Sequence, residues 1–174
     1  LNEGCVPTKS LLYCAKQYAG AMHGADFGTK AESVCYSHPD ALKRKNQVVK
    51  RLVRGVASAM KTNGVTVCRA AGAAQGKTPS GAFLVTAGEE TLQAEHLIFA
   101  TGSTAVIPPI PGVQDGLASG FVMTNREILE LPEQPKVLCC IGGGVIGLEM
   151  ACYFAAIGTR VIVVEMMPKI AGTT

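Results

Sequence analysis

The chain has 174 residues, of which 48% are hydrophobic and 17% are charged. This balance is typical of a globular α/β protein and excludes a disordered one. The net charge of +3 is too small to indicate a nucleic-acid partner, so we expect none. The length allows one full core or parts of two domains.

The cysteine pattern bears on metal sites and on the redox compartment. Seven cysteines form no CxxC pair and leave one over, so neither a zinc site nor a secreted disulfide framework is predicted. We therefore expect no metal and a reduced, cytoplasmic setting. No secretory signal is visible after Leu1, and the absence of an initial methionine suggests that the true start is missing.

Two helices are predicted in the first third of the chain. Apolar spacing indicates one over Thr8–Ala19, with Cys5 at or just before its first turn and Gly20 as its stop. A second is predicted over about Ala41–Asn63, where Asn63-Gly64 is a stop signal.

The second predicted helix carries an apolar stripe and a basic surface. The stripe consists of Leu42, Val49, Leu52 or Val53, Val56 and Met60. The basic residues are Lys43, Arg44, Lys45, Lys50, Arg51 and Arg54. We interpret them as a solvated face rather than as a binding surface.

Short strands follow from Val65. The segments VTVC, GAFLVTA and TLQAEHLIFA, separated by turns with glycine, predict a small antiparallel meander that leads into a buried strand at Leu97–Ala100. The proline-rich run Ile107–Gly112 then predicts a stiff connector. A short helix is expected after Thr124-Asn125, with Asn125 or Thr124 as its cap and Glu127 in its first turn.

The last part of the chain predicts a strand, a glycine turn, a helix and a second strand. These span Lys136–Ile141, the turn GGGVIG, Leu148–Ile157 with Gly158 as its stop, and Arg160–Glu165. A membrane span over 137–158 is an alternative, but Glu149 and three consecutive glycines argue against it.

The glycine turn has the GxGxxG pattern of dinucleotide-binding proteins. Glycines there let backbone N–H groups approach a pyrophosphate, and the N-terminus of the following helix favours its charge. A tight turn without a ligand is the alternative. The candidate cofactor-binding residues are Gly142, Gly143, Gly144, Val145, Ile146 and Gly147.

Glu165 ends the second strand near the spacing at which an acidic residue reaches the ribose of a dinucleotide. A carboxylate can accept hydrogen bonds from a free 2′-hydroxyl and would repel a 2′-phosphate. We therefore predict NAD over NADP, although Lys169 lies close enough to leave NADP open.

Cys5 is a candidate redox residue. A thiol at the start of a helix meets N–H dipoles that favour the thiolate, and Lys9, one turn on, adds positive charge on the same face. A buried structural cysteine and a surface lysine are the alternatives.

Three motifs in order resemble those of the pyridine nucleotide–disulfide oxidoreductases. They are LNEGCVPTKSLL at the start, HLIFATGS followed by PPIPG, and IGGGVIGLE. The resemblance covers nearly the whole chain. It implies an incomplete FAD-binding domain, of helices and a meander, over 1–107, a linker over 108–135, and the first βαβ unit of a Rossmann-type NAD-binding domain over 136–174.

The family's roles carry over to matching positions. The resemblance implies that Cys5 is the redox cysteine nearer the flavin, paired with a cysteine immediately before Leu1. It also implies that Lys9 lies beside the flavin, facing Glu149. Thr101, Gly102 and Ser103 would contact FAD, and Gly72 would lie near its adenine end or form a plain turn.

Among family members, the chain is most similar to those that oxidise dihydrolipoyl groups, on the basis of LNEGC, LLYCAK and Glu165. This implies a lipoyl-bearing partner from a 2-oxo acid dehydrogenase or glycine cleavage complex, and a homodimer at full length. Mercuric and glutathione-type reductases, a non-catalytic redox sensor and a membrane-anchored protein are the alternatives.

Several of the family's parts are missing from the sequence. They are the first redox cysteine, the N-terminal glycine turn for FAD and the C-terminal domain with its His–Glu pair. His23, His38 and His96 match none of those positions and are interpreted as structural or exposed. Ala105 also replaces a frequent proline. We therefore expect this chain alone to be inactive.

Overall fold

A computed structural model describes residues 1–172 and divides the chain into two compact units. The first unit comprises Leu1–Gly55 together with the chain from Ala105 onward, and the second comprises Val56–Thr104. The α/β class predicted from the sequence is confirmed.

The first helix, α1, spans Cys5–Met22, so it begins three residues before the predicted Thr8 and includes Cys5 in its first turn. The predicted stop at Gly20 is wrong, because the helix continues for two more residues. A glycine inside a helix costs only about 1 kcal/mol relative to alanine, so it does not by itself end one. A short 3₁₀ helix, η1 (Gly24–Phe27), follows and ends at Gly28 in the left-handed conformation.

Helix α2 spans His38–Thr62, three residues longer at its start than predicted, and its end before Asn63-Gly64 agrees with the predicted stop. The basic residues along it are exposed with one exception. Lys45 is fully buried, so its assignment to a solvated face is wrong. The apolar residues Leu52, Val53, Val56 and Met60 are exposed.

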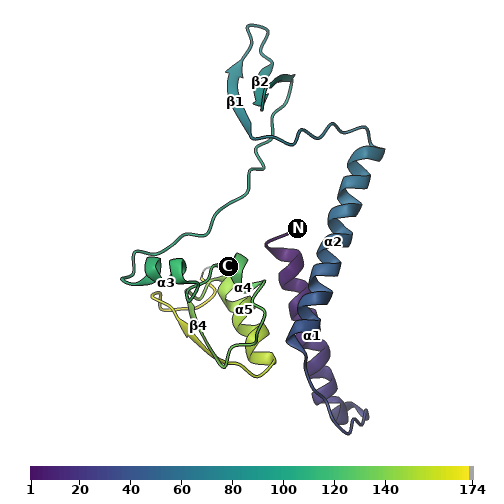
Figure 1. Cartoon of the computed structure of the whole chain (residues 1–174), viewed down its shortest axis with the longest axis vertical. Helices are drawn as coiled ribbons and strands as arrows, with labels where there is room; N and C mark the ends of the chain where they lie inside the picture. Colours follow the sequence, from purple (N-terminus) through teal and green to yellow (C-terminus); the bar gives the residue numbers. More distant parts are fainter. Residues whose placement is uncertain (173–174) are drawn as a thin grey trace. The chain divides into compact units, whose positions relative to one another are not determined.

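The second unit contains the predicted antiparallel meander, drawn in teal in Figure 1. Its strands are β1 (Gly72–Lys77), β2 (Phe83–Ala87) and β3 (Glu90–Ala94), in the order β1-β2-β3. The predicted strand at VTVC is wrong, because residues 65–68 are irregular. The alternation of Val65 and Val67 indicated a strand, but the sheet begins instead at Gly72.

The buried strand predicted at Leu97–Ala100 is also wrong, since the segment is irregular and Ile98 is 86% exposed. A strand forms only when its backbone groups pair with a neighbour. In the described part of the chain no strand pairs with this segment, and its apolar composition alone could not show that.

The proline-rich connector leads into a helix that the sequence did not predict, α3 (Val113–Ser119), which lies between two left-handed glycines, Gly112 and Gly120. The short helix α4 (Asn125–Ile128) was predicted, and Thr124 caps it. Thr124 and Glu127 form a capping box, in which each side chain satisfies a backbone N–H group of the first turn.

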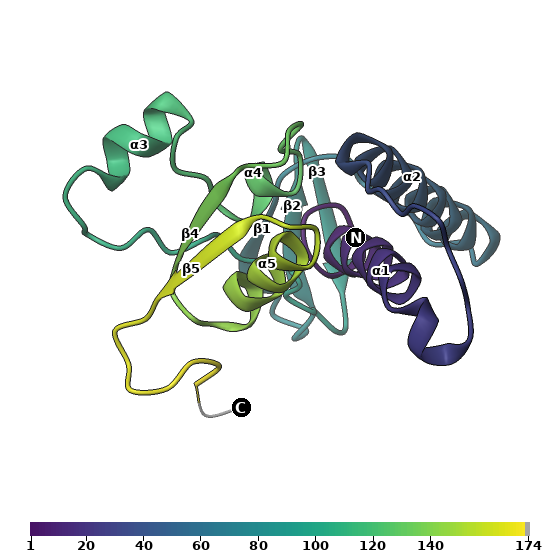
Figure 2. The same cartoon turned by 90° about the horizontal axis from the view of Figure 1, so that it is seen from below.

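The last elements form the predicted βαβ unit, seen in yellow and green in Figure 2. Strands β4 (Val137–Ile141) and β5 (Arg160–Val164) pair in parallel, and α5 (Val145–Ala156) connects them. Helix α5 begins three residues before the predicted Leu148 and stops before Gly158, which is left-handed.

The stretch 137–158, weighed above as a membrane span, is therefore a strand and a helix joined by a glycine turn. Within residues 1–172, none of the helices combines the length and the apolar character needed to cross a bilayer.

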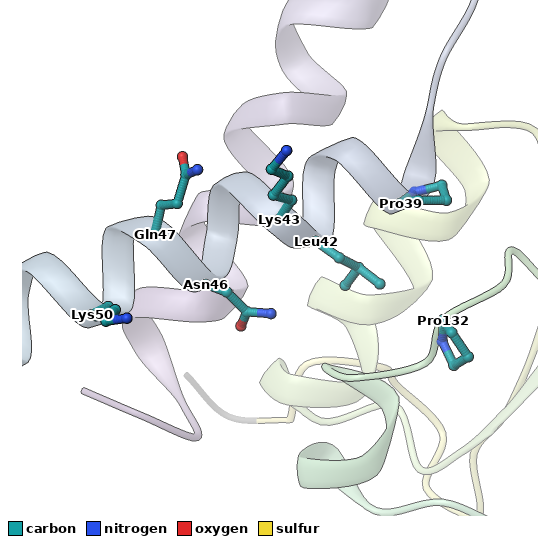
Figure 3. Close-up of a pocket in the computed structure, with 7 residues that line it drawn as sticks. All are labelled: Pro39, Leu42, Lys43, Asn46, Gln47, Lys50 and Pro132. Atoms are coloured by element: carbon teal, nitrogen blue, oxygen red, sulfur yellow. The ribbon is translucent and has the colours of Figure 1, made fainter.

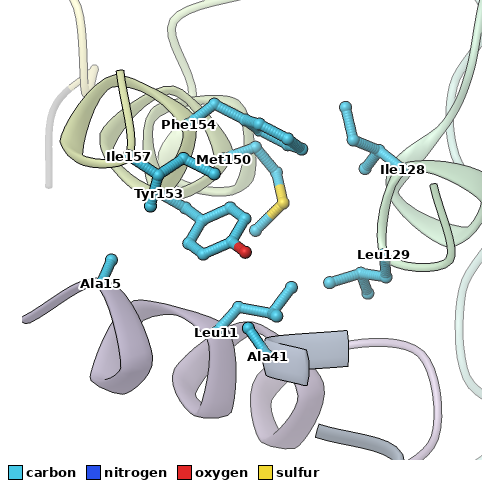
Figure 4. Packing of buried hydrophobic residues seen from close by; sticks show 9 residues of the cluster. All are labelled: Leu11, Ala15, Ala41, Ile128, Leu129, Met150, Tyr153, Phe154 and Ile157. Carbon is cyan, nitrogen blue, oxygen red and sulfur yellow. The ribbon is translucent and has the colours of Figure 1, made fainter. Parts of the chain in front are cut away.

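The core of the first unit lies where α5 packs on α1 and on the start of α2 (Figure 4). Tyr153 and Phe154 of α5 are completely buried there. Burying aromatic and aliphatic side chains in this way is the main source of stability, so the contact between these helices fixes the position of α5. The buried apolar members are Leu11, Ala15, Ala41, Ile128, Leu129, Met150, Tyr153, Phe154 and Ile157.

Candidate functional site

The glycine turn between β4 and α5 has a geometry that only glycine fits at two positions. Gly142 has a φ of +98°, and its N–H group donates to the carbonyl of Val164, 2.8 Å away. At Gly147 a Cβ would lie 2.6 Å from the carbonyl oxygen of Gly142. The backbone of the turn and the first turn of α5 therefore touch without an intervening side chain.

The start of α5 offers backbone donors to a ligand. Gly144 is its N-cap residue and makes no side-chain capping hydrogen bond. The first N–H groups of a helix lack intrahelical partners and carry partial positive charge, a combination that suits a pyrophosphate. A Cβ on Gly144 would meet nothing within 4 Å, so the space beside this residue is open, and the turn fits a dinucleotide.

Glu165 directly follows β5, and its side chain contacts the glycine turn. Its carboxylate accepts hydrogen bonds from the N–H groups of Gly143 and Met167, both at 2.7 Å. The Met167 and Gly143 bonds, in that order of size, hold the pKa of this carboxyl below its usual value. A carboxylate has about four acceptor positions, so Glu165 can still accept hydrogen bonds from a ribose.

The candidate redox residue belongs to the same unit. Cys5 is the first residue of α1, and its thiol is free and exposed. Lys9, one turn further along α1, forms an ion pair with Glu149 of α5. Glu149 lies one helical turn after Val145, the first residue of α5. The structure thus joins the two side chains that the resemblance placed face to face, close to the end of α5 that carries the glycine turn.

The segment before Cys5 is held by α4, which sequence reasoning did not anticipate. The side-chain amide of Asn125 donates to the carbonyl of Glu3 at 3.1 Å. Arg126 forms an ion pair with the Glu3 carboxylate at 2.7 Å. Asn125 and Glu3 are 122 positions apart in the chain, and no local pattern marks such a contact.

A second unanticipated feature is a buried polar network around Tyr153 of α5. The hydroxyl of Tyr153 lies 2.8 Å from Nδ1 of His38 and 3.2 Å from the hydroxyl of Tyr36. The other ring nitrogen of His38 lies 2.9 Å from the carbonyl of Leu131. Burial raises the pKa of Tyr153 far above its usual value, so this phenol stays protonated.

The remaining predicted residues lie in the second unit. Gly72 is the first residue of β1 and pairs with Ala87 of β2. Thr101, Gly102 and Ser103 form an exposed irregular segment, in which Gly102 has a φ of +79°. Their contact with FAD remains a prediction.

An open groove lies between α2 and the loop after α4 (Figure 3), and none of the predicted site residues lines it. Its lining is Pro39, Leu42, Lys43, Asn46, Gln47, Lys50 and Pro132. Within residues 1–172, no group of three or more His, Cys, Asp or Glu side chains is placed to hold a metal ion.

Comparison with known proteins gives a family match over the whole chain. The model of the pyridine nucleotide-disulphide oxidoreductases matches residues 1–174. A dihydrolipoyl dehydrogenase of Acholeplasma laidlawii is 40% identical over 174 residues, which are 99% of this chain and 50% of that protein. A dihydrolipoyl dehydrogenase of Chlamydia pneumoniae is 34% identical over 98% of this chain and 35% of its own length.

The solved structures that resemble this chain include a Cu(II) complex of RclA, an HOCl-induced flavoprotein disulfide reductase from Escherichia coli. It superposes with a TM-score of 0.73 at 26% identity, over 98% of this chain and 34% of that one. The chain therefore spans between about a third and a half of the length of the proteins it matches.

Proposed function

Because this chain belongs to the pyridine nucleotide-disulphide oxidoreductase family, whose members use FAD and a nicotinamide dinucleotide, we propose that it is part of a dihydrolipoyl dehydrogenase. The whole protein would oxidise a protein-bound dihydrolipoyl group to its disulfide and pass the electrons through Cys5 and FAD to NAD. Its relatives of that name support the choice of substrate.

One arrangement carries this proposal. Cys5 begins α1 with a free, exposed thiol. One turn later Lys9 pairs with Glu149, on the helix that starts at the glycine turn. The candidate redox thiol and the candidate dinucleotide turn are thus connected through a single helix–helix contact.

The residues of this chain have separate tasks in the proposed reaction. A dihydrolipoyl dithiol loses two electrons and two protons, NAD⁺ gains a hydride, and one proton is released. Cys5, the redox cysteine nearer the flavin, would be released as a thiolate when the substrate sulfur attacks the other cysteine of the disulfide. FAD, when bound, supplies the two-electron acceptor between the cysteine pair and the nicotinamide. Lys9, paired with Glu149, supplies positive charge beside the Cys5 end of α1.

The glycine turn would hold the dinucleotide. The N–H groups at the start of α5 would bind the pyrophosphate, and Glu165 would accept hydrogen bonds from the ribose. The partner would be a lipoyl-bearing protein of a 2-oxo acid dehydrogenase or glycine cleavage complex. We also propose a homodimer and a cytoplasmic location for the whole protein.

The test is turnover by the full-length protein. Purified protein should carry bound flavin and form NADH from dihydrolipoamide, and Cys5→Ser should abolish this turnover. Cys35→Ser is the matched control, because Cys35 is also exposed and free but lies outside the site. Turnover of the Cys5→Ser protein at the wild-type rate would contradict the proposal.

The same assay separates the alternatives. Oxidised glutathione or Hg(II) with a reduced dinucleotide would be turned over by the other reductases of the family. A protein that binds dinucleotide and oxidises reversibly at Cys5, without turning over any dithiol or disulfide, would indicate a redox sensor.

A further inference from the structure

We propose that the buried Tyr153–His38 pair is a positioning device that sets Glu149 opposite Lys9. The proposal rests on the function proposed above, because the Lys9–Glu149 pair matters for turnover only in a redox enzyme. It concerns residues to which no role was assigned from the sequence or from the resemblance.

Glu149 and Tyr153 share one face of α5. They are four residues apart, or about one helical turn, so their side chains lie above one another. Whatever fixes the rotation of α5 at Tyr153 also fixes the direction of Glu149. Met150 and Phe154, the residues that follow each of them, are buried and prevent the helix from shifting sideways.

Tyr153 itself is held in place by burial and by a hydrogen bond. The side chain is completely buried, and its hydroxyl has a hydrogen-bond partner 2.8 Å away in Nδ1 of His38, the first residue of α2. In Figure 4 its ring lies between α5 and the residues of α1 and α2. Leaving a buried hydroxyl without its partner is costly, so the position of Tyr153 is strongly constrained.

The direction of each hydrogen bond in this network follows from the carbonyl at one end of it. The carbonyl of Leu131 can only accept, so Nε2 of His38 donates to it across 2.9 Å. In the uncharged ring Nδ1 then accepts from Tyr153, and the Tyr153 oxygen accepts from Tyr36. Each donor has one acceptor. The network therefore joins α5 to the start of α2 and to the loop after α4 in one arrangement.

The Lys9–Glu149 pair is far more exposed than the Tyr153–His38 pair. Lys9 is largely exposed and Glu149 is about one quarter exposed. An exposed ion pair holds its own geometry poorly, because the gain barely exceeds the entropy of two long side chains. A fixed helix beneath Glu149 removes part of that entropy loss. The buried network thus fixes the position of the helix that carries Glu149, which the exposed ion pair could not do by itself.

The experiment uses the full-length holoenzyme with the variant Tyr153→Phe, which removes only the hydroxyl. We expect kcat with dihydrolipoamide to fall on the order of fivefold, the rate equivalent of one lost hydrogen bond, with KM little changed. The flavin midpoint potential should shift in the same direction as in Glu149→Gln. Tyr13→Phe, an exposed tyrosine of α1, is the matched control and should match the wild type.

A double-mutant cycle separates positioning from a merely structural role. In the Glu149→Gln background Tyr153→Phe should change kcat and the flavin potential little, since the group it positions is gone. Additive effects, or a Tyr153→Phe protein with wild-type kcat and potential, would overturn the proposal. Tyr36→Phe keeps the Tyr153–His38 bond and should give a smaller change, which provides a milder variant if Tyr153→Phe folds poorly. A wild-type protein without flavin or turnover would instead refute the proposed function.

Discussion

The closest approach in the glycine turn is at Gly147, where a Cβ would lie 2.6 Å from the carbonyl oxygen of Gly142. Real Cβ atoms do not come so close to backbone, so Gly147→Ala must widen the turn or shift α5. We expect the free energy of unfolding to fall by about 1–3 kcal/mol, the usual cost of overpacking. Urea unfolding of the purified protein measures it.

Gly144→Ala is the control for this effect. Gly144 has a φ of −74°, which any residue adopts, and a Cβ there meets nothing within 4 Å. Its unfolding should change by less than about 1 kcal/mol, while NADH binding weakens because the methyl group occupies the space in front of the helix N-terminus. Equal destabilisation by the two substitutions would show that packing against Gly142 is not the reason for Gly147.

Residue-scale prediction from the sequence succeeded where the chemistry is local. The GxGxxG turn and a cap at Thr124 or Asn125 depend on neighbours within a few positions, and both could be predicted; the capping box that Thr124 forms with Glu127 was not. The Tyr153–His38 pair joins residues 115 positions apart. Nothing in the periodicity near His38 indicated that its ring would be buried with a phenol.

At the scale of elements, α2 has one buried lysine among basic residues that are otherwise exposed. Lys45 is fully buried, and its ammonium donates to the carbonyl of Leu129 at 2.7 Å and pairs with Glu130 at 2.5 Å. We expect Lys45→Met to lower the free energy of unfolding by about 1–3 kcal/mol, because the carbonyl loses its partner. Lys43→Met, an exposed site on the same helix, should change it by less than about 0.5 kcal/mol. Urea denaturation of both variants is the measurement, and equal effects would contradict the role given to Lys45.

Helices and turns were predicted better than strands, for a physical reason. A helix satisfies its own backbone, so the spacing of apolar residues located α1, α2 and α5 to within a few positions. A strand requires a partner, and the segments 65–68 and 97–100 have strand-like composition but pair with no strand in the described chain. Strands β2 and β3 could be predicted because a short turn joins them, and the β4–β5 pair because a glycine turn and a helix between two apolar segments indicate a parallel crossover, whereas β1 was missed.

At the scale of the whole molecule, we propose that the glycine turn and Glu165 together select the coenzyme. Glu165 is held against the turn by its hydrogen bond from Gly143, so its charge stays where the ribose would lie. The carboxyl is ionised at neutral pH, and the Met167 and Gly143 N–H groups lower its pKa further. A 2′-phosphate would therefore meet a fixed negative charge.

We expect the full-length protein to prefer NAD to NADP by about tenfold or more in kcat/KM, since every 1.4 kcal/mol of repulsion gives a factor of about ten. Glu165→Gln removes the charge but keeps an acceptor for Gly143, so the preference should narrow, chiefly through a higher rate with NADP. Steady-state assays with both coenzymes measure it, and Glu165→Asp, which keeps the charge, is the control that should retain the preference for NAD. A wild-type protein that prefers NADP would show that Glu165 does not select a free 2′-hydroxyl. Lys169, the nearby cation, would then be the residue to test for binding of the 2′-phosphate.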